Sequence, residues 1–244
     1  MVEHVPADVF GEDYLYFYET WLDDEVAHRQ AELVWGLVGL EPGAEVLDVP
    51  CGHGRIANRL AVRGARVVGL DRDSFFLERA RADAAAQGVE VDYVQGDMRE
   101  LPWEGRFDAV VNWFTSFGYF DDEGNRAWLE AARRTLRPGG RLALDVHSRD
   151  SFARHFHPAG VVERDGDLLV DRHHFDVETG RAETERWVVR GGRVRKTAYS
   201  VRFYTVTELR DLLLGAGFLS VAAVGHDGAP LGAETRRMVV VATR

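Results

Sequence analysis

One stretch of the sequence decides the fold, Glu45-Val46-Leu47-Asp48-Val49-Pro50-Cys51-Gly52-His53-Gly54-Arg55-Ile56-Ala57. The apolar residues up to Val49 predict the end of a buried strand, the two glycines predict a tight turn, and the residues from Ile56 open an amphipathic helix. Such a turn brings backbone N–H groups to a helix N-terminus, where a ligand can approach closely. The spacing Gly52-x-Gly54-x-x-Ala57 therefore indicates a nucleotide-type binding fold.

An acid at the end of this strand narrows the kind of ligand. Asp48 precedes the glycine turn, where a dinucleotide would place an anionic pyrophosphate, so its carboxylate would repel that ligand. S-adenosylmethionine (SAM) carries an ammonium and a sulfonium but no phosphate, so an acid near the turn favours it. The stretch resembles motif I of the class I SAM-dependent methyltransferases. The alternative is that Asp48 only caps the next helix and the glycines only turn the chain.

Strands and helices alternate along the middle of the chain. After the first strand, further strands are expected at 64–71, 89–94, 107–112 and 142–146, with helices at 53–62, 74–86 and 123–136. This alternation predicts a parallel sheet with helices on both faces. A helix at 206–214 precedes two last strands, 218–224 and 237–243, which we expect to pair as an antiparallel edge and to complete seven strands.

Two further segments complete the expected organisation. Residues before Pro42 are predicted to be helical, and we expect residues 1–40 to form a helical lid. Between residues 155 and 205, alternating segments without helices predict an antiparallel meander inserted after the fifth strand. The expected fold class is α/β, a Rossmann-like, seven-stranded, mostly parallel sheet with an N-terminal helical lid and a small antiparallel β insertion. All 244 residues are expected to form a single domain.

Acids are expected at the carboxyl ends of the first three strands, namely Asp48, Asp71 and Asp97. Ligands bind at that edge of an open parallel sheet, and a cation with an amine, a diol and an aromatic amine needs acceptors there. In order and interval the motifs are similar to those of the methyltransferase family over most of the chain. The resemblance implies that Asp71 binds the ribose diol, that Asp97 accepts from the adenine amine and that Met98 packs on the ring.

The resemblance also supplies a set of cofactor-binding residues for SAM and its product S-adenosylhomocysteine (SAH). They are Tyr14, Asp48, Pro50, Gly52, Gly54, Arg55, Asp71, Arg72, Asp97, Met98 and Asn112. More narrowly, residues 13–18, 51–55 and 115–120 resemble a broad bacterial subgroup that carries a meander after strand five. Some similar enzymes methylate sugar amines or peptide amines.

Methyl transfer from a sulfonium is an in-line displacement, so the protein mainly aligns the acceptor, excludes water and handles one proton. His147, at the expected end of the fifth strand, is the candidate base or substrate contact, together with Tyr119. The alternative for His147 is a surface histidine bonded to the backbone. Substrate contacts are expected from Tyr18, Trp21, Trp113, Phe114, Phe117 and Tyr204. The alternative for Trp113 and Phe117 is a place in the core.

Composition limits the partners of the chain. Its formal net charge is −10, which argues against a nucleic-acid partner. Cys51 is the only cysteine, so an intrachain disulfide and a Cys-based metal site are excluded, and we expect no metal. No apolar run approaches the ~20 residues of a membrane span. We therefore expect a cytoplasmic protein, a monomer or a homodimer, that binds a small-molecule substrate and no membrane.

The sequence thus predicts an enzyme, a SAM-dependent methyltransferase that acts on nitrogen or oxygen of a small molecule. One alternative is a methyltransferase for peptide or protein amines, which suit an acidic groove. Another is a non-catalytic SAM-binding protein of the same fold, whose substrate pocket would be blocked by Trp113, Phe117 or the meander.

Overall fold

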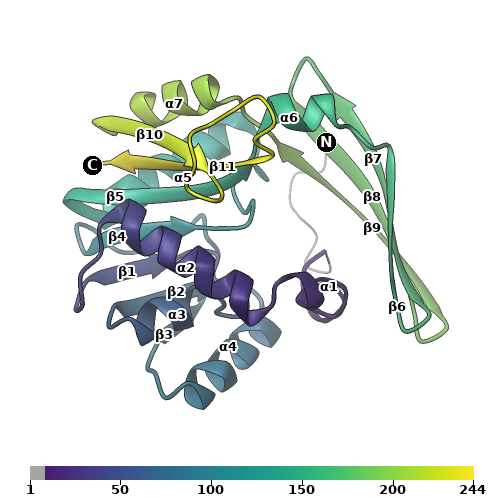
Figure 1. The fold of residues 1–244 in the computed structure, drawn as a ribbon, viewed down its shortest axis with the longest axis horizontal. Coiled ribbons are helices and arrows are strands. Elements are labelled where there is room, and N and C mark those ends of the chain that lie inside the picture. Colours follow the sequence, from purple (N-terminus) through teal and green to yellow (C-terminus); the bar gives the residue numbers. More distant parts are fainter. Residues whose placement is uncertain (1–8) are drawn as a thin grey trace.

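The computed structural model describes residues 9–244 and shows a seven-stranded sheet between two layers of helices (Figure 1). The strand order is β10-β11-β5-β4-β1-β2-β3. Strands β1 to β5 are parallel, and β11 is antiparallel to both β5 and β10. The bounds are β1 (Glu45–Asp48), β2 (Arg66–Asp71), β3 (Asp92–Gln95), β4 (Phe107–Asn112), β5 (Leu136–His147), β10 (Ser220–Gly225) and β11 (Arg237–Thr243). The expected α/β class is confirmed.

The strand order places a ligand-binding edge between β1 and β4. The chain moves from β1 outward through β2 and β3, and then returns to β4 on the other side of β1. At such a switch point the loops that leave neighbouring strands diverge, which opens a crevice at the carboxyl ends of the strands. The two loops concerned are residues 49–56 and 113–121.

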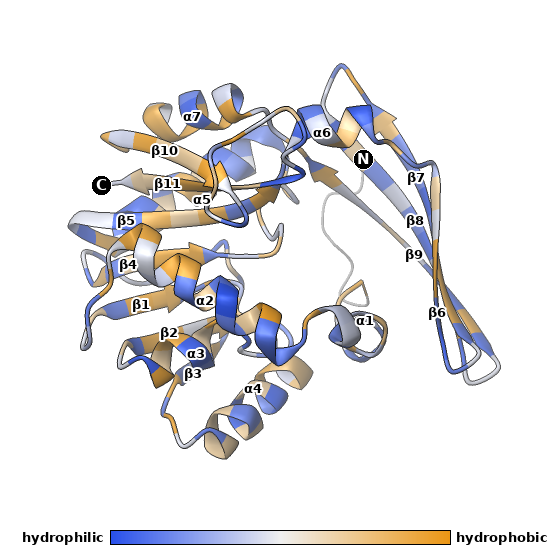
Figure 2. Cartoon of the chain, viewed as in Figure 1, coloured by the Kyte–Doolittle hydropathy of each residue, from blue (hydrophilic) through white to orange (hydrophobic). Residues whose placement is uncertain are grey.

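Helices cover both faces of the sheet. Helices α2 (Asp24–Val38), α3 (Ala57–Val62) and α4 (Ser74–Ala86) bury side chains such as Leu77 against the face that presents Val46. Helices α5 (Asp122–Thr135) and α7 (Val206–Gly215) cover the opposite face, where Trp128 packs in one cluster with Leu47. The strands of this sheet are accordingly coloured mostly hydrophobic in Figure 2, whereas the helices show mixed faces.

The insertion after β5 forms its own sheet, which stands apart from the first one (Figure 1). Its antiparallel strands follow chain order, β6 (Ala159–Arg164), β7 (Asp167–Asp176), β8 (Arg181–Arg190) and β9 (Arg193–Arg202). They lie within the expected range 155–205. The short helix α6 (Arg149–Arg154) and strand β6 were not expected from the sequence.

The N-terminal helical segment is attached to this insertion. Helix α1 (Glu12–Tyr18) and the 3₁₀ helix η1 (Glu19–Trp21) lie between the two sheets (Figure 1), and Phe17 is buried there against Leu169 and Val188. The structure corrects the expected lid of residues 1–40, because α2 packs on the parallel sheet as part of the core. The part of that range before Val9 lies outside the described residues.

Candidate active site

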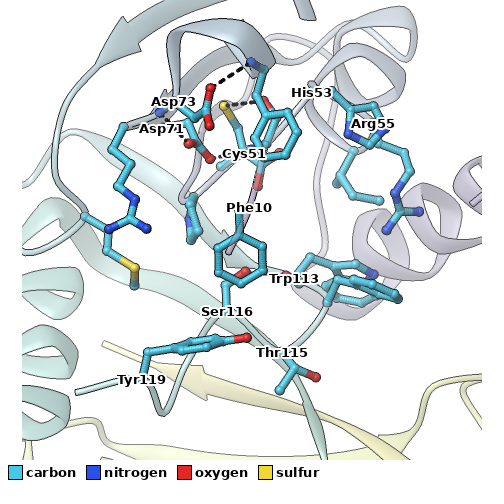
Figure 3. Close-up of a pocket in the computed structure, with 18 of the residues that line it drawn as sticks. Phe10, Cys51, His53, Arg55, Asp71, Asp73, Trp113, Thr115, Ser116 and Tyr119 are labelled. Atoms are coloured by element: carbon cyan, nitrogen blue, oxygen red, sulfur yellow. Dashed lines mark hydrogen bonds between the residues drawn. The ribbon is translucent and has the colours of Figure 1, made fainter. Parts of the chain in front are cut away.

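A pocket of about 1240 Å³, part of it open to solvent, lies at the carboxyl ends of the parallel strands (Figure 3). Its walls come from the ends of β1, β2, β3 and β4, and from α1 and α4. The lining residues that the sequence had indicated are Tyr14, Asp48, Pro50, Gly52, Arg55, Asp71, Arg72, Asp97, Met98, Trp113, Phe114 and Tyr119.

Charged side chains line only one part of the pocket. This charged wall, as we call it, consists of Asp48, Arg55, Asp71, Arg72, Asp73, Asp97 and Arg99. Its members end or follow β1, β2 and β3, so that the three acids expected at one edge do share one cleft. The wall that follows β4 carries only aromatic rings and hydroxyl groups.

Asp48 is the most deeply buried acid of the charged wall, with 2% of its surface exposed. Its carboxylate accepts a hydrogen bond from the Ala57 backbone N–H, so it caps α3, whereas its Oδ2 has no partner. Burial raises the pKa of Asp48 to about 7, although nearby Arg55 lowers it. Asp48 lines the pocket, and a buried carboxylate with one oxygen that has no hydrogen-bond partner is suited to a cationic ligand.

Asp71 holds the glycine turn in place. Its Oδ2 accepts from the Gly52 N–H at 2.8 Å and its Oδ1 accepts from the Asp73 N–H at 3.0 Å. The expectation of bare N–H groups at this turn is therefore corrected for Gly52. Burial raises the pKa of Asp71, while these two backbone hydrogen bonds lower it.

Glycine stands at positions 52 and 54 of the motif for different physical reasons. Gly52 has φ 53°, lines the pocket and has open space where a Cβ would lie. Gly54 also has positive φ, but it does not line the pocket, and a Cβ there would lie 2.1 Å from the Tyr93 hydroxyl oxygen. Gly54 is thus required for close packing of the turn on β3, and its predicted contact with cofactor is not supported by this geometry.

Asp97 is paired within the charged wall. Arg99 donates from Nε to Asp97 Oδ1 at 2.9 Å and from Nη2 to Oδ2 at 2.5 Å. These bonds lower the pKa of Asp97 and keep it ionised. Oδ1 also accepts from the Arg99 backbone N–H at 2.9 Å, so Oδ2 is the oxygen with more capacity left for a donor such as an adenine amine.

We call the residues after β4 that line the pocket the β4 wall, namely Trp113, Phe114, Thr115, Ser116, Tyr119 and Phe120. Phe114 and Thr115 have φ of 62° and 59°, the left-handed region that few residues other than glycine adopt. The Trp113 Nε1 and the Thr115 Oγ1 are buried and have no hydrogen-bond partner. These two groups leave hydrogen-bonding capacity at this end of the pocket.

Aromatic side chains close the pocket from the N-terminal segment. Phe10 packs edge-on against Tyr14 and Tyr119, with ring centroids 5.4 and 5.7 Å apart. Tyr14 in turn meets Phe76 of α4 and stacks on Tyr18 at 4.6 Å. Phe10 therefore bridges α1 and the β4 wall, as Figure 3 shows for Phe10 and Tyr119. Burial raises the pKa of Tyr14, which keeps its phenol protonated.

Several expected site residues lie elsewhere. His147 does not line the pocket; its Nε2 lies 3.1 Å from Arg237 Nη1, and burial together with that guanidinium lowers its pKa to about 4. Asn112 is fully buried and donates to the Val49 carbonyl oxygen. Trp21 is 54% exposed. The corrections for His147 and Asn112 share a cause, because a sequence shows which strand a residue ends but not which way its side chain points.

Of the residues expected to contact substrate, some line the pocket and others do not. Trp113 and Phe114 line the pocket, whereas Phe117 and Tyr204 stack on each other in the core at 5.6 Å. Tyr18 lies behind Tyr14, where its hydroxyl accepts from Arg186. The lining residues that the sequence had not indicated are Phe10, Leu22, Cys51, His53, Ile56, Asp73, Phe76, Gly96, Arg99, Thr115, Ser116 and Phe120. His53 and Asp73 stand in or beside motifs, which was a usable signal, but nothing marked Phe10 or Phe76.

Among residues 9–244, no three or more His, Cys, Asp or Glu side chains lie together as a metal site would require. Within the same range, no helix has the length and hydropathy needed to cross a bilayer.

Comparisons with known proteins agree with this geometry. The family described as "Methyltransferase domain" matches residues 46–140. The chain is 32% identical over 215 residues to the cypemycin N-terminal methyltransferase of a Streptomyces species, covering 83% of this chain and 84% of that protein. It spans about half the length of other curated relatives, such as 55% of the putative methyltransferase YqeM of Bacillus subtilis, to which it is 32% identical.

Solved structures give the same result. The amino pentose methyltransferase CalS10 of Micromonospora echinaspora, solved with SAM bound, is 28% identical with a TM-score of 0.66, over 89% of this chain and 91% of that one. The sugar N-methyltransferase KedS8 of a Streptoalloteichus species is 25% identical with a TM-score of 0.70, over 98% and 96%. With the motifs, the strand order and the pocket in agreement, the chain belongs to the class I SAM-dependent methyltransferases.

Proposed function

We propose that the protein transfers the methyl group of SAM to a nitrogen or oxygen of a small-molecule acceptor. The observation that carries this proposal is the division of one pocket into a charged wall and an uncharged, aromatic β4 wall. A cofactor with an ammonium, a diol and an adenine needs acceptors of the first kind. An acceptor that must be aligned in a dry environment needs walls of the second kind.

The residues of the charged wall fit SAM. The unpartnered Asp48 Oδ2 suits the ammonium, Asp71 suits the ribose diol, and Asp97 and Met98 suit the adenine. When bound, SAM supplies a methyl group on a positively charged sulfur. The protein's part is to hold the acceptor in line and exclude water. Phe10 and Tyr14 close the pocket, and the raised pKa values of Tyr14 and Tyr119 leave both phenols as hydrogen-bonding groups rather than bases.

An amine acceptor is favoured over a hydroxyl. A neutral amine needs no base before it attacks, whereas a hydroxyl benefits from one. Among the described residues of the β4 wall no carboxylate or imidazole is present, His147 lies outside the pocket, and His53 lines it from the turn after β1. The sugar N-methyltransferase and amino pentose methyltransferase among the similar structures support the same acceptor class.

A second candidate is a peptide amine. It is favoured by the 32% identity over 215 residues to the cypemycin N-terminal methyltransferase, named for a peptide N-terminus. A non-catalytic role has less support, since Phe117 packs in the core and Trp113 forms a wall of the pocket rather than an obstruction.

Cofactor binding is tested by isothermal titration calorimetry with SAM and SAH. We expect micromolar affinity for both, and we expect Asp71→Ala to weaken it by about 10-fold or more, since a charged hydrogen-bond acceptor contributes ~1.5–3 kcal/mol. Asp92→Ala, at an exposed acid on the opposite end of β3, is the matched control. Absence of binding by the wild-type protein contradicts the proposal.

The acceptor class is tested with methyl-labelled SAM and a panel of amino sugars, aryl hydroxyl compounds and short peptides with free N-termini. Incorporation into amino sugars but not into peptides supports the first candidate, and the reverse pattern supports the second. Incorporation only into hydroxyl compounds contradicts the preference for an amine.

A further inference from the structure

Two adjacent residues of the β4 wall adopt a costly backbone conformation. Phe114 and Thr115, with φ of 62° and 59°, are neither glycine nor asparagine, and both line the pocket. Such a residue raises the free energy of the folded state and persists only where its surroundings fix it. The neighbours that hold these two residues are therefore candidates for a role in the reaction.

One residue of β5 holds both backbone N–H groups. Asp145 accepts from the Phe114 N–H through its Oδ2 at 3.0 Å and from the Thr115 N–H through its carbonyl oxygen at 2.8 Å. Only 1% of the surface of Asp145 is exposed. The two strained residues are thus tied to a single buried anchor that does not itself line the pocket.

Arg237, on the last strand, binds this anchor. Its Nε donates to Asp145 Oδ1 at 3.1 Å and its Nη2 donates to Oδ2 at 2.6 Å. Its guanidinium carbon also lies 4.9 Å from the centre of the Phe114 ring. One guanidinium therefore fixes the anchor of the strained backbone and also contacts the ring that the backbone presents to the pocket.

His147 fixes the guanidinium in turn. His147 and Arg237 are directly paired across β5 and β11, and His147 Nε2 lies 3.1 Å from Arg237 Nη1. Arginine has no acceptor, so this nitrogen of His147 must accept, which requires a neutral imidazole with its proton on Nδ1. The charged groups that face the ring are Arg237 and Asp145, and Phe203 packs on it at 5.4 Å.

We propose that Arg237, held by Asp145 and His147, is a positioning residue for the methyl acceptor. We name these three residues the Arg237 clasp. It acts through Phe114 and Thr115 on the β4 wall. The inference rests on the proposed function, and it gives His147 the role of a hydrogen-bond acceptor for Arg237 instead of a base. The three residues of the clasp lie outside the pocket lining, so they act on the acceptor indirectly.

The test compares Arg237→Met and Arg237→Lys with Arg236→Met, a control at the exposed neighbouring arginine. Calorimetry measures SAH affinity, and steady-state kinetics use the panel amine that the wild-type protein methylates. For Arg237→Met we expect SAH affinity within about threefold of wild type and an acceptor KM raised at least about tenfold, since a small misplacement at a reacting centre can cost ~100-fold. We expect Arg237→Lys to keep one contact to Asp145, so its acceptor KM should lie between the values of the wild type and of Arg237→Met.

A readout that needs no acceptor is amide hydrogen exchange at Phe114 and Thr115. In Arg237→Met these two amides should exchange at least about tenfold faster, while amides in the core of α5 keep their protection. In the same variant, NMR should show the His147 ring changing from the Nδ1–H tautomer towards the Nε2–H tautomer, which dominates in water. His147→Gln assigns the signal.

Unchanged exchange at Phe114 and Thr115 overturns the proposal whatever the activity. An unchanged acceptor KM overturns it as well, and so does a loss of SAH affinity in proportion to lost stability, which marks a merely structural role. If the wild-type protein binds no SAH, the proposed function fails, and the exchange experiment still decides whether the clasp holds the β4 wall.

Discussion

Removing the charge of Asp48 should prevent the unliganded protein from losing stability as the pH rises, and should weaken cofactor binding at the same time. Asp48 is buried, one carboxylate oxygen accepts from the Ala57 N–H, and the other has no partner. Asn at this position keeps an acceptor for the Ala57 N–H and removes the buried charge. The substitution therefore separates the cost of the charge in folding from its use in binding.

The direction in which stability changes with pH follows from the direction of the pKa shift of Asp48. Burial raises the pKa of Asp48 from 3.8 to about 7, so folding favours its protonated form. The associated stability is complete below pH 3.8 and is lost as the pH rises to about 7, above which the loss is constant. With ~1.4 kcal/mol for each pH unit between the two pKa values, the total is about 4 kcal/mol.

Most of that loss falls between pH 5 and pH 8. We expect the unfolding free energy of Asp48→Asn, minus that of the wild type, to increase by about 2–3 kcal/mol over this range. The amide nitrogen of Asn has no partner either and costs ~1–3 kcal/mol, but this cost does not depend on pH. The change with pH, rather than the absolute difference, therefore measures the buried charge.

Cofactor binding should show the opposite response. The ammonium of SAH supplies a partner for the ionised carboxylate, so wild-type affinity should rise from pH 5 to pH 8. Asp48→Asn should bind more weakly at pH 8 and should show little of this rise.

The assays are urea unfolding and calorimetry with SAH at pH 5, 6, 7 and 8. Asp92→Asn, at an exposed acid where β3 begins, is the control, and its stability should follow the wild type across this range. Parallel stability curves for the wild type and Asp48→Asn would refute the argument, because they would mean that Asp48 is not a buried charge with a raised pKa.

Two stability predictions come from other parts of the fold. Gly54→Ala should lower the unfolding free energy by about 2–5 kcal/mol, since its Cβ would lie 2.1 Å from the Tyr93 hydroxyl and its φ is 77°. Adding Tyr93→Phe to this variant should restore part of the loss. If urea unfolding shows no recovery, the hydroxyl is not the obstacle. Asp171→Leu alone should lower the unfolding free energy by ~3–5 kcal/mol, because it leaves Arg186, which is 4% exposed, without its ion pair. The double variant Asp171→Leu with Arg186→Met should lose clearly less stability. Equal losses in thermal unfolding would contradict a buried ion pair.

The elements that the sequence predicts best are those with local start and stop signals. Helix α4 was predicted at 74–86 and strand β4 at 107–112, and both are found with those bounds. Asp73 caps the first turn of α4, and Gly88 with positive φ follows its end. Such signals lie within a few residues of the element they delimit, so one sequence is enough to find them.

The elements that were missed depend on distant partners. Strand β5 begins at Leu136 and continues through the Pro138-Gly139-Gly140 turn, because Leu136 pairs with Phe107 of β4 before the turn and residues 141–144 pair with both β4 and β11 after it. Strand β6 is an exposed edge, so its sequence lacks a buried alternation. The same reason hid the clasp, since Arg237 follows its partner Asp145 by 92 residues.

Some residues of the pocket destabilise the folded state, and residues outside the pocket wall offset that destabilisation. The buried charge of Asp48 and the left-handed residues Phe114 and Thr115 together cost several kcal/mol, a large share of the ~5–15 kcal/mol that stabilises a typical domain. Asp145 and Arg237 stabilise the β4 wall without lining the pocket. A substitution at either residue should therefore change activity although it contacts no ligand. Lining residues alone are then an incomplete guide to what determines the acceptor.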